Sequence, residues 1–135
     1  MSWFGEKGIY SNWKGSDITI QALAGTIYPV GPKDDTPIFT GETEASIIGG
    51  TNAFIATLVA ILENRINQKT NVSILESNMI LGELQSSDSI RFGRPNSREG
   101  INRFFPTCPL GIYKCRTGWL GTVSYTHLRA HETTS

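Results

Sequence analysis

The sequence predicts a mixed fold of helices with short strands, and two kinds of segment, together with the chain length, support this prediction. Apolar residues recur at helical spacing over residues 46–64 and again, more briefly, over residues 75–84. Two stretches, residues 26–28 and 72–74, are short and extended in character and are bounded by turn-forming or polar residues. At 135 residues the chain is long enough for one ordinary domain and too short for two.

The N-terminal quarter predicts a loop followed by a short helix. Residues 1–16 are rich in glycine and aromatic residues without a helical or strand period, so we expect a packed loop. Ser16 or Asp17 is placed to cap a helix over the apolar residues 18–24. Gly25 then supplies the left-handed conformation that ends a helix.

The longest predicted helix is the most apolar part of the chain. Its first half is so uniformly apolar or small that we expect burial on nearly every side, with Gly49 and Gly50 permitting close approach of another backbone. From Gln85 onward the pattern predicts mostly loop. The apolar residues at helical spacing in this helix are Phe54, Ile55, Leu58, Val59, Ile61 and Leu62.

Composition disfavours several partners. Lys plus Arg and Asp plus Glu both number 12, so no basic face for nucleic acid is expected. No run approaches the roughly 18 consecutive apolar residues of a membrane span, and residues 1–8 do not have the pattern of a signal peptide. We therefore expect a cytoplasmic protein without a membrane partner.

Four residues near the C-terminus superficially suggest a zinc site. Cys108, Cys115, His127 and His131 give the spacing C-x6-C-x11-H-x3-H. A zinc finger needs two to four residues between its cysteines, so the first gap is too long. We expect no metal and read both cysteines as free thiols, because two cysteines do not make a disulfide framework.

Two carboxylates, Glu42 and Glu44, precede the long helix. Negative charge at a helix start is stabilised by the helix dipole by about 0.3–1 kcal/mol, which explains both residues without catalysis. General acid or base chemistry would need a cleft and shifted pKa values, which spacing alone does not indicate. The residues therefore favour a helix-start role.

Several segments in order resemble the family III CoA-transferases, which include formyl-CoA and carnitine-CoA transferases and alpha-methylacyl-CoA racemases. The resemblance spans nearly all of residues 3–121 and implies an α/β fold. It also implies that residues 1–122 are an internal part of that domain, without the N-terminal Rossmann-like part that carries most CoA contacts. The segments are WFGEKGIYSNWKGSDITIQALAG, GGTNAFIATLVAILENR, NVSILESN and FPTCPLGIYKCRTGWLG.

The resemblance implies a reaction and a nucleophile. Such enzymes move CoA from an acyl-CoA to a carboxylic acid through anhydride and thioester intermediates on an aspartate at the start of a glycine-rich helix. That aspartate falls on Ser46, which cannot form a mixed anhydride, and residues 1–122 hold no histidine as a base. Glu44 could substitute only if the helix start changed register. The expected activity is thus degenerate, and the alternative is a non-catalytic acyl-CoA-binding or scaffold subunit that pairs with an active homologue.

Three residues are candidates for binding coenzyme A. Lys14 matches a lysine that contacts CoA in formyl-CoA transferase, and Asp17 and Gln21 match polar positions beside it. The residues themselves leave plainer roles open, which are a solvated surface lysine, a helix cap and a helix-surface glutamine. The resemblance also implies a homodimeric parent.

The match has departures and an abrupt end. The family's T-G-x-G-Q turn is missing between Arg65 and Asn71, and Ile9 replaces an expected proline. The segment VSYTHLRAHET resembles a translated sequencing adapter of the kind found in assembled metagenomic sequence, so we interpret residues 123–135 as a non-native tail. The 1–122 segment is then expected to be a fragment, inactive alone.

Overall fold

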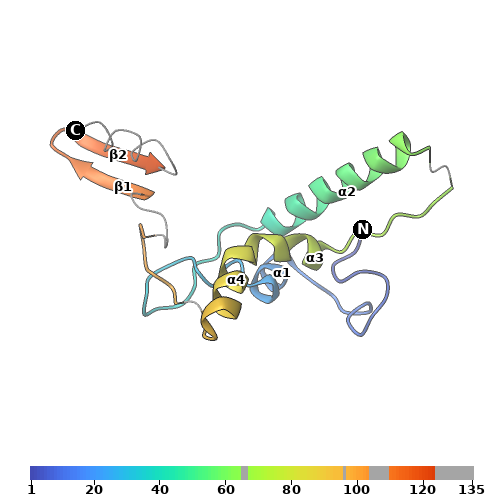
Figure 1. Ribbon diagram of the computed structural model, residues 1–135, viewed down its shortest axis with the longest axis horizontal. Coiled ribbons are helices and arrows are strands. Elements are labelled where there is room, and N and C mark those ends of the chain that lie inside the picture. Colours follow the sequence, from blue (N-terminus) through green and yellow to red (C-terminus); the bar gives the residue numbers. More distant parts are fainter. Residues whose placement is uncertain (65–66, 96, 104–109, 124–135) are drawn as a thin grey trace.

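The computed structural model describes residues 1–64, 67–95, 97–103 and 110–123. Figure 1 shows the helices grouped around the start of α2, whose second half extends away from the group, while a β-hairpin lies apart. The predicted α/β mixture of helices with short strands is confirmed. In chain order the elements are α1 (Asp17–Ala24), α2 (Glu44–Leu62), α3 (Ile74–Met79), the 3-10 helix η1 (Ile80–Gly82), α4 (Glu83–Phe92), β1 (Leu110–Cys115) and β2 (Gly118–Val123).

Helix α1 forms where the sequence predicts it. Ser16 is the N-cap residue with an extended backbone, and its hydroxyl lies 2.8 Å from that of Thr19. Gly25 ends the helix at φ 77°, a left-handed conformation that glycine adopts without strain. Its amide donates to the carbonyl of Ala22, which satisfies a group that the helix end would otherwise leave open.

A small apolar core lies where α1, α3 and the first turns of α2 meet. Gly49 makes this packing possible, because a Cβ atom at that position would lie only 2.9 Å from Cγ1 of Ile74. The predicted approach of another backbone is therefore wrong. At Gly49 the close neighbour is the Ile74 side chain, and Gly50 faces open space. The buried members of the core are Phe4, Ile20, Ala45 and Ile74, with Trp3 and Leu75 packed against them.

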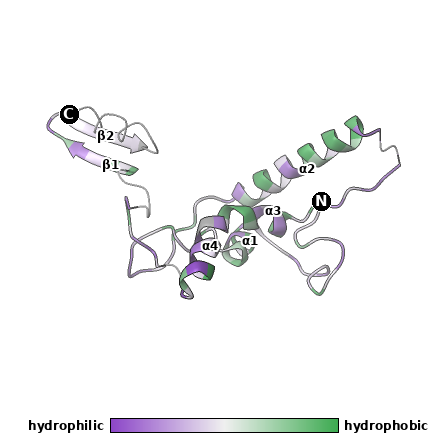
Figure 2. Ribbon diagram, in the orientation of Figure 1, coloured by the Kyte–Doolittle hydropathy of each residue, from purple (hydrophilic) through white to green (hydrophobic). Residues whose placement is uncertain are grey.

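Helix α2 is far more exposed than the sequence predicts. Ala45 and Gly49 are its buried residues, so the expectation of burial on nearly every side is wrong for the part of the chain that the structure describes. Phe54 is 64% exposed and Leu62 is 84% exposed. Figure 2 shows apolar residues repeated along the length of α2. Beyond its first turns, few described residues pack against the helix, which is the physical reason for the difference.

The exposed helix raises the question of a membrane. By length and composition alone α2 could cross a bilayer, and 11% of its apolar window is buried. The apolar core helix of a soluble protein satisfies the same two criteria, so a single helix of this kind is weak evidence.

The N-terminal segment is a loop, as predicted, but residues 6–10 and 12–14 are exposed, so it is packed only in part. The Tyr10 and Trp13 rings meet edge to face with centroids 4.6 Å apart, and Phe4 lies 6.1 Å from Trp13. The possible strand at residues 72–74 is not formed. Ser73 makes an isolated parallel bridge with Ser2, and Ile74 begins α3.

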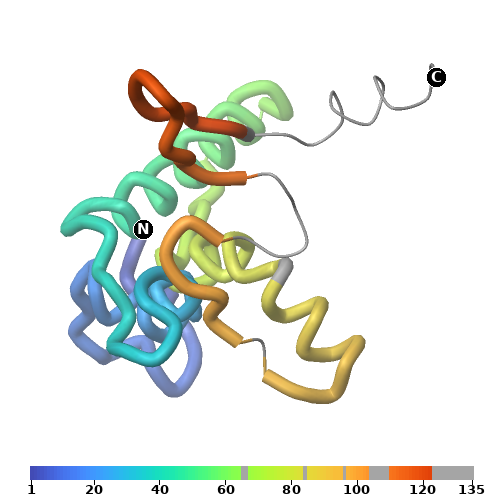
Figure 3. The backbone as a smooth tube through the Cα atoms, turned by 90° about the vertical axis from the view of Figure 1, so that its left-hand side faces the viewer, coloured from blue at the N-terminus to red at the C-terminus, as the bar shows by residue number. Residues whose placement is uncertain are grey.

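The chain after residue 74 differs most from the prediction. The predicted helix over residues 75–84 is present as α3, η1 and the start of α4, and α4 continues to Phe92 where a loop was expected. The hairpin of β1 and β2 was also not predicted, because its two-residue turn, Arg116 and Thr117, has no Asn-Gly or Asp-Gly signature. In Figure 3, the segment that follows α4 comes beside the connection between α1 and α2.

Candidate functional site

The carboxylate of Asp17 joins the start of α1 to the start of α2. The amide of Ala45 donates to Oδ1 at 2.6 Å, and the amide and hydroxyl of Ser46 donate to Oδ2 at 3.2 Å and 2.5 Å. Asp17 is 8% exposed. Amides in the first turn of a helix have no partner inside the helix, and a carboxylate there also interacts favourably with the helix dipole. Asp17 therefore caps α2 from a neighbouring helix.

Gln21 extends this contact one turn further along α1 and is fully buried. Its Nε2 donates to the carbonyl of Gly41 at 3.0 Å and lies 3.4 Å from Oδ1 of Asp17. Its Oε1 accepts from the hydroxyl of Thr40 at 3.2 Å, and the same hydroxyl contacts a carboxylate oxygen of Glu44. One hydroxyl carries one proton, so Thr40 can donate to only one of these two acceptors at a time.

Asn78 holds the start of α2 from the side of α3 and was not among the residues predicted from the sequence. It is fully buried, and its Nδ2 donates to the carbonyls of Ala45 at 3.1 Å and Ile74 at 2.8 Å. An asparagine in a short polar helical stretch gives no sequence signal for such a contact. Ala45 is thus held by its amide through Asp17 and by its carbonyl through Asn78.

The pKa of Asp17 reflects two opposing effects. Burial alone would raise the pKa, because it removes water from the charged form. Hydrogen bonds from the Ser46 hydroxyl, the Ala45 amide, Gln21 and the Ser46 amide stabilise the carboxylate more strongly, so the pKa lies below the ordinary value. Asp17 is therefore an ionised acceptor and a weak base.

The structure places four of the five predicted site residues in one cluster. Asp17, Gln21, Glu44 and Ser46 surround the first turn of α2, with the Ser46 side chain on Asp17 and Glu44 partly exposed at the first helical position. Lys14 is exposed on the loop that leads to α1, and no hydrogen bond from it is found among the described residues. Substrate binding by Lys14, Asp17 and Gln21 stays a prediction. Asp17 does act as a helix cap, but it caps α2 and not its own helix.

The sequence matches the family described as CoA-transferase family III over residues 1–131. The chain belongs to CoA-transferase family III. No match was found among curated proteins.

A solved structure has the same fold. It is the crystal structure of a CaiB/BaiF family protein from Brucella suis, with a TM-score of 0.74 and 21% sequence identity, and the match covers 87% of this chain. The chain spans 32% of the length of that protein. The family III resemblance predicted from the sequence segments is confirmed. Residues 124–135, most of the predicted tail, lie outside the described residues, so the boundary at residue 123 stays a prediction.

Among the described residues, no group of three His, Cys, Asp or Glu side chains is placed to hold a metal ion. Cys115 is an exposed free thiol. The other residues of the zinc-like spacing, Cys108, His127 and His131, lie outside the described residues.

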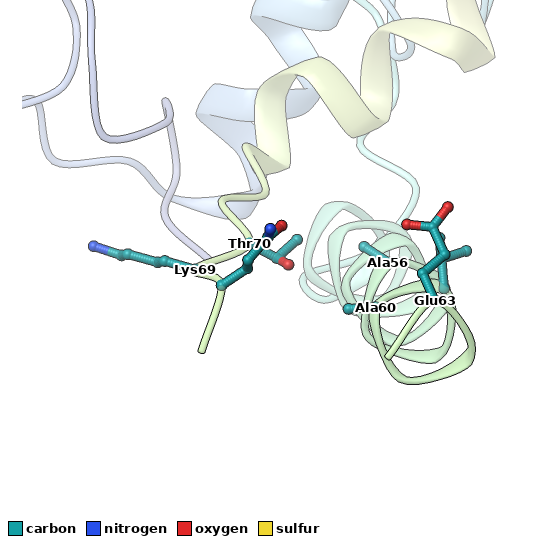
Figure 4. A pocket seen from close by; sticks show the side chains of 7 residues that line it. Ala56, Ala60, Glu63, Lys69 and Thr70 are labelled. Carbon is teal, nitrogen blue, oxygen red and sulfur yellow. The ribbon is translucent and has the colours of Figure 1, made fainter. Parts of the chain in front are cut away.

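A cavity of about 380 Å³ lies far from the cluster, between the second half of α2 and residues 68–70 (Figure 4). Ala60, on its α2 side, is fourteen residues beyond Ser46, which is roughly 20 Å along the helix axis. Lys69 forms an ion pair with Glu6 at 2.7 Å. The cavity is therefore separate from the start of α2. Its lining residues are Ala56, Val59, Ala60, Glu63, Gln68, Lys69 and Thr70.

Proposed function

We propose that this chain is part of an acyl-CoA:carboxylate CoA-transferase whose nucleophile position is degenerate at Ser46. The observation that supports this proposal is the 2.5 Å hydrogen bond from the Ser46 hydroxyl to Oδ2 of Asp17. The side chain that aligns with the family nucleophile is thereby committed to a helix cap. We place the parent protein in the cytoplasm.

The family chemistry depends on a carboxylate at this position. A carboxylate that attacks an acyl-CoA releases the CoA thiolate and forms a mixed anhydride. The thiolate can then attack the enzyme's carbonyl carbon of that anhydride, which releases the donor's carboxylate and leaves an enzyme thioester. A serine hydroxyl would instead form an ester, which is a much weaker acyl donor, and it would need a base to accept its proton. The route through an enzyme thioester is closed to an alcohol, because the hydroxyl leaves no carbonyl carbon on the enzyme.

The two neighbouring carboxylates do not supply what Ser46 lacks. Asp17 is a weak base, because its oxygens already accept hydrogen bonds from Ala45 and Ser46 and its pKa is lowered. Glu44 begins α2, two residues before Ser46, and its carboxylate contacts Thr40. A nucleophilic Glu44 would require the helix start to shift, which would break both amide contacts to Asp17.

The test compares the longer natural protein with its Ser46→Asp and Ser46→Ala variants. Each is incubated with an acyl-CoA and a carboxylic acid, and CoA exchange and covalent acylation of the peptide around residue 46 are measured. We expect no exchange or acylation in the wild-type protein or in Ser46→Ala, and acylation on the new carboxylate of Ser46→Asp. Turnover by the wild-type protein that is lost in Ser46→Ala would refute a degenerate site.

A second candidate is a non-catalytic acyl-CoA-binding or scaffold subunit that pairs with an active homologue. Two observations favour it, namely the exposed Lys14 beside α1 and the exposed apolar surface of α2. A lysine is a suitable point charge for a phosphate group. This function predicts CoA binding that is weakened in Lys14→Ala and retained in Lys7→Ala, which removes another exposed lysine of the same loop. Equal binding by both variants would argue against it.

A further inference from the structure

A buried arginine after α4 holds the connection between α1 and α2. Arg98 is 9% exposed, and its Nε donates to the carbonyl of Tyr28 at 2.9 Å. Its Nη1 donates to the carbonyls of Pro32 at 3.1 Å and Asp35 at 2.5 Å. The guanidinium also lies over the Tyr28 ring, 5.6 Å from its centroid. Figure 3 shows this segment, near residue 98, beside the connection near residues 28–35.

The hydrogen-bond acceptors of Arg98 in these contacts are all main-chain carbonyls, reached across 63 to 70 positions of sequence. A guanidinium presents its donors in a fixed planar fork, so three such bonds fix the path of the main chain in the connection. They do not depend on which side chains the connection carries. A lysine has a single donor head and cannot reproduce the fork.

The connection passes this constraint to the candidate site. The amide of Ile38 donates to the carbonyl of Val30 at 2.9 Å, which closes the loop that Arg98 holds. Two residues later, Thr40 and then Gly41 bind the side chain of Gln21 at 3.2 Å and 3.0 Å. The loop is therefore linked to the first turn of α2 by a short stretch of chain that is itself held by hydrogen bonds.

We propose that Arg98 is a positioning residue for the start of α2. By fixing residues 28–38 it sets where Thr40 and Gly41 meet Gln21, and hence how the amides of Ala45 and Ser46 meet Asp17. This inference rests on the proposed function only in taking the start of α2 as the site. The test of this inference measures local structure and not CoA exchange. The inference can therefore fail while the proposed function holds, and the proposed function can fail while the inference holds.

The first experiment needs only the wild-type chain. Hydrogen exchange of the Arg98 Nε proton and of the Ala45 and Ser46 amides is measured by NMR across a series of low urea concentrations. If Arg98 positions the start of α2, these protons open together, with the same dependence on urea. Rapid exchange of the Arg98 Nε proton while both amides stay protected would overturn the proposal.

The second experiment compares Arg98→Lys with Arg94→Lys, a matched change at an exposed arginine of the same segment. In Arg98→Lys we expect the Ala45 and Ser46 amides to exchange at least about tenfold faster, because the freed carbonyls release the connection. The pKa of Asp17 should rise toward its ordinary value, while the Ser77 amide inside α3 keeps its exchange rate.

Arg94→Lys should match the wild-type protein. Asp35→Asn should match it as well, because Arg98 binds the main chain of residue 35 and not its carboxylate. Unchanged Ala45 and Ser46 exchange in Arg98→Lys, or an Asp35→Asn variant that reproduces its effect, would refute the proposal. If Arg98→Lys does not fold, the wild-type exchange measurement decides the question alone.

Discussion

Replacing Asp17 with asparagine should destabilise the chain by about 1.5–3 kcal/mol at neutral pH. Asparagine has nearly the same shape, so its Oδ1 can keep the bond from the Ala45 amide. Its amide group, however, faces the amide and hydroxyl of Ser46. The hydroxyl can rotate and accept a hydrogen bond from it, but the Ser46 amide then faces a second donor and loses its acceptor. One lost hydrogen bond to a charged acceptor, at roughly 1.5–3 kcal/mol, gives the estimate.

The effect should depend on pH in a defined direction. The pKa of Asp17 is lower in the folded chain than in the unfolded chain, where an ordinary value of about 3.9 applies. The carboxylate therefore contributes its full stabilisation above the unfolded pKa, and this is lost as the pH falls through the folded pKa. The difference between the wild-type chain and Asp17→Asn should be constant near neutrality and shrink below about pH 4.

The assay is urea unfolding followed by tryptophan fluorescence, because Trp3 packs against the core. Asp34→Asn is the control, since it removes the same charge from an exposed position of the α1–α2 connection. Equal unfolding midpoints for the wild-type chain and Asp17→Asn at neutral pH would refute the argument that this carboxylate caps α2. A difference that grows as the pH falls would contradict the sign of the pKa shift.

The remaining predictions concern α2. Gly49→Ala should lower the free energy of unfolding by about 1–2 kcal/mol, because its Cβ would lie 2.9 Å from Ile74. Gly50→Ala should instead raise the free energy of unfolding by up to about 1 kcal/mol, because alanine has the higher helix propensity and position 50 faces open space. Equal effects of the two variants in urea unfolding would contradict this. The exposed apolar surface of α2 should make the chain self-associate as its concentration rises. Phe54→Lys with Leu62→Lys should then reduce light scattering without loss of helix by circular dichroism, and sharp thermal unfolding of a monomeric wild-type chain would count against it.

Local signals in the sequence predicted the elements near the site well. The capping position at Ser16 and the left-handed Gly25 defined α1, and apolar spacing located α2 to within two residues at each end. The order of several short segments identified the family, because segments that match in sequence order are more specific than any one motif. The resemblance selected Asp17 and Gln21 only as polar positions beside Lys14, and their place at the start of α2 came from the structure.

Long-range features could not be predicted in the same way. Whether α2 is buried depends on which polypeptide packs against it. Apolar periodicity indicates that a helix favours burial, but it does not identify the segment that would cover the helix. Arg98 acts across 63 to 70 positions on main-chain carbonyls, so no side-chain pattern marks its targets. Asn78 likewise bonds to a carbonyl on another helix. The hairpin turn contains ordinary residues whose conformation is set by the paired strands.

The residue at position 46 decides what the start of α2 can do chemically. With a hydroxyl there, the only carboxylate on the Ala45 and Ser46 amides is Asp17, among the residues that the structure describes, and the helix dipole and hydrogen bonds keep it ionised. A carboxylate at position 46 would lie close to Asp17, and two such groups cannot both ionise without one pKa rising. The same amides would then stabilise a shared negative charge and could hold a reacting oxygen. Under the proposed function, serine at this position replaces a carboxylate pair with a helix cap, so one residue accounts for both the capping geometry and the loss of the nucleophile.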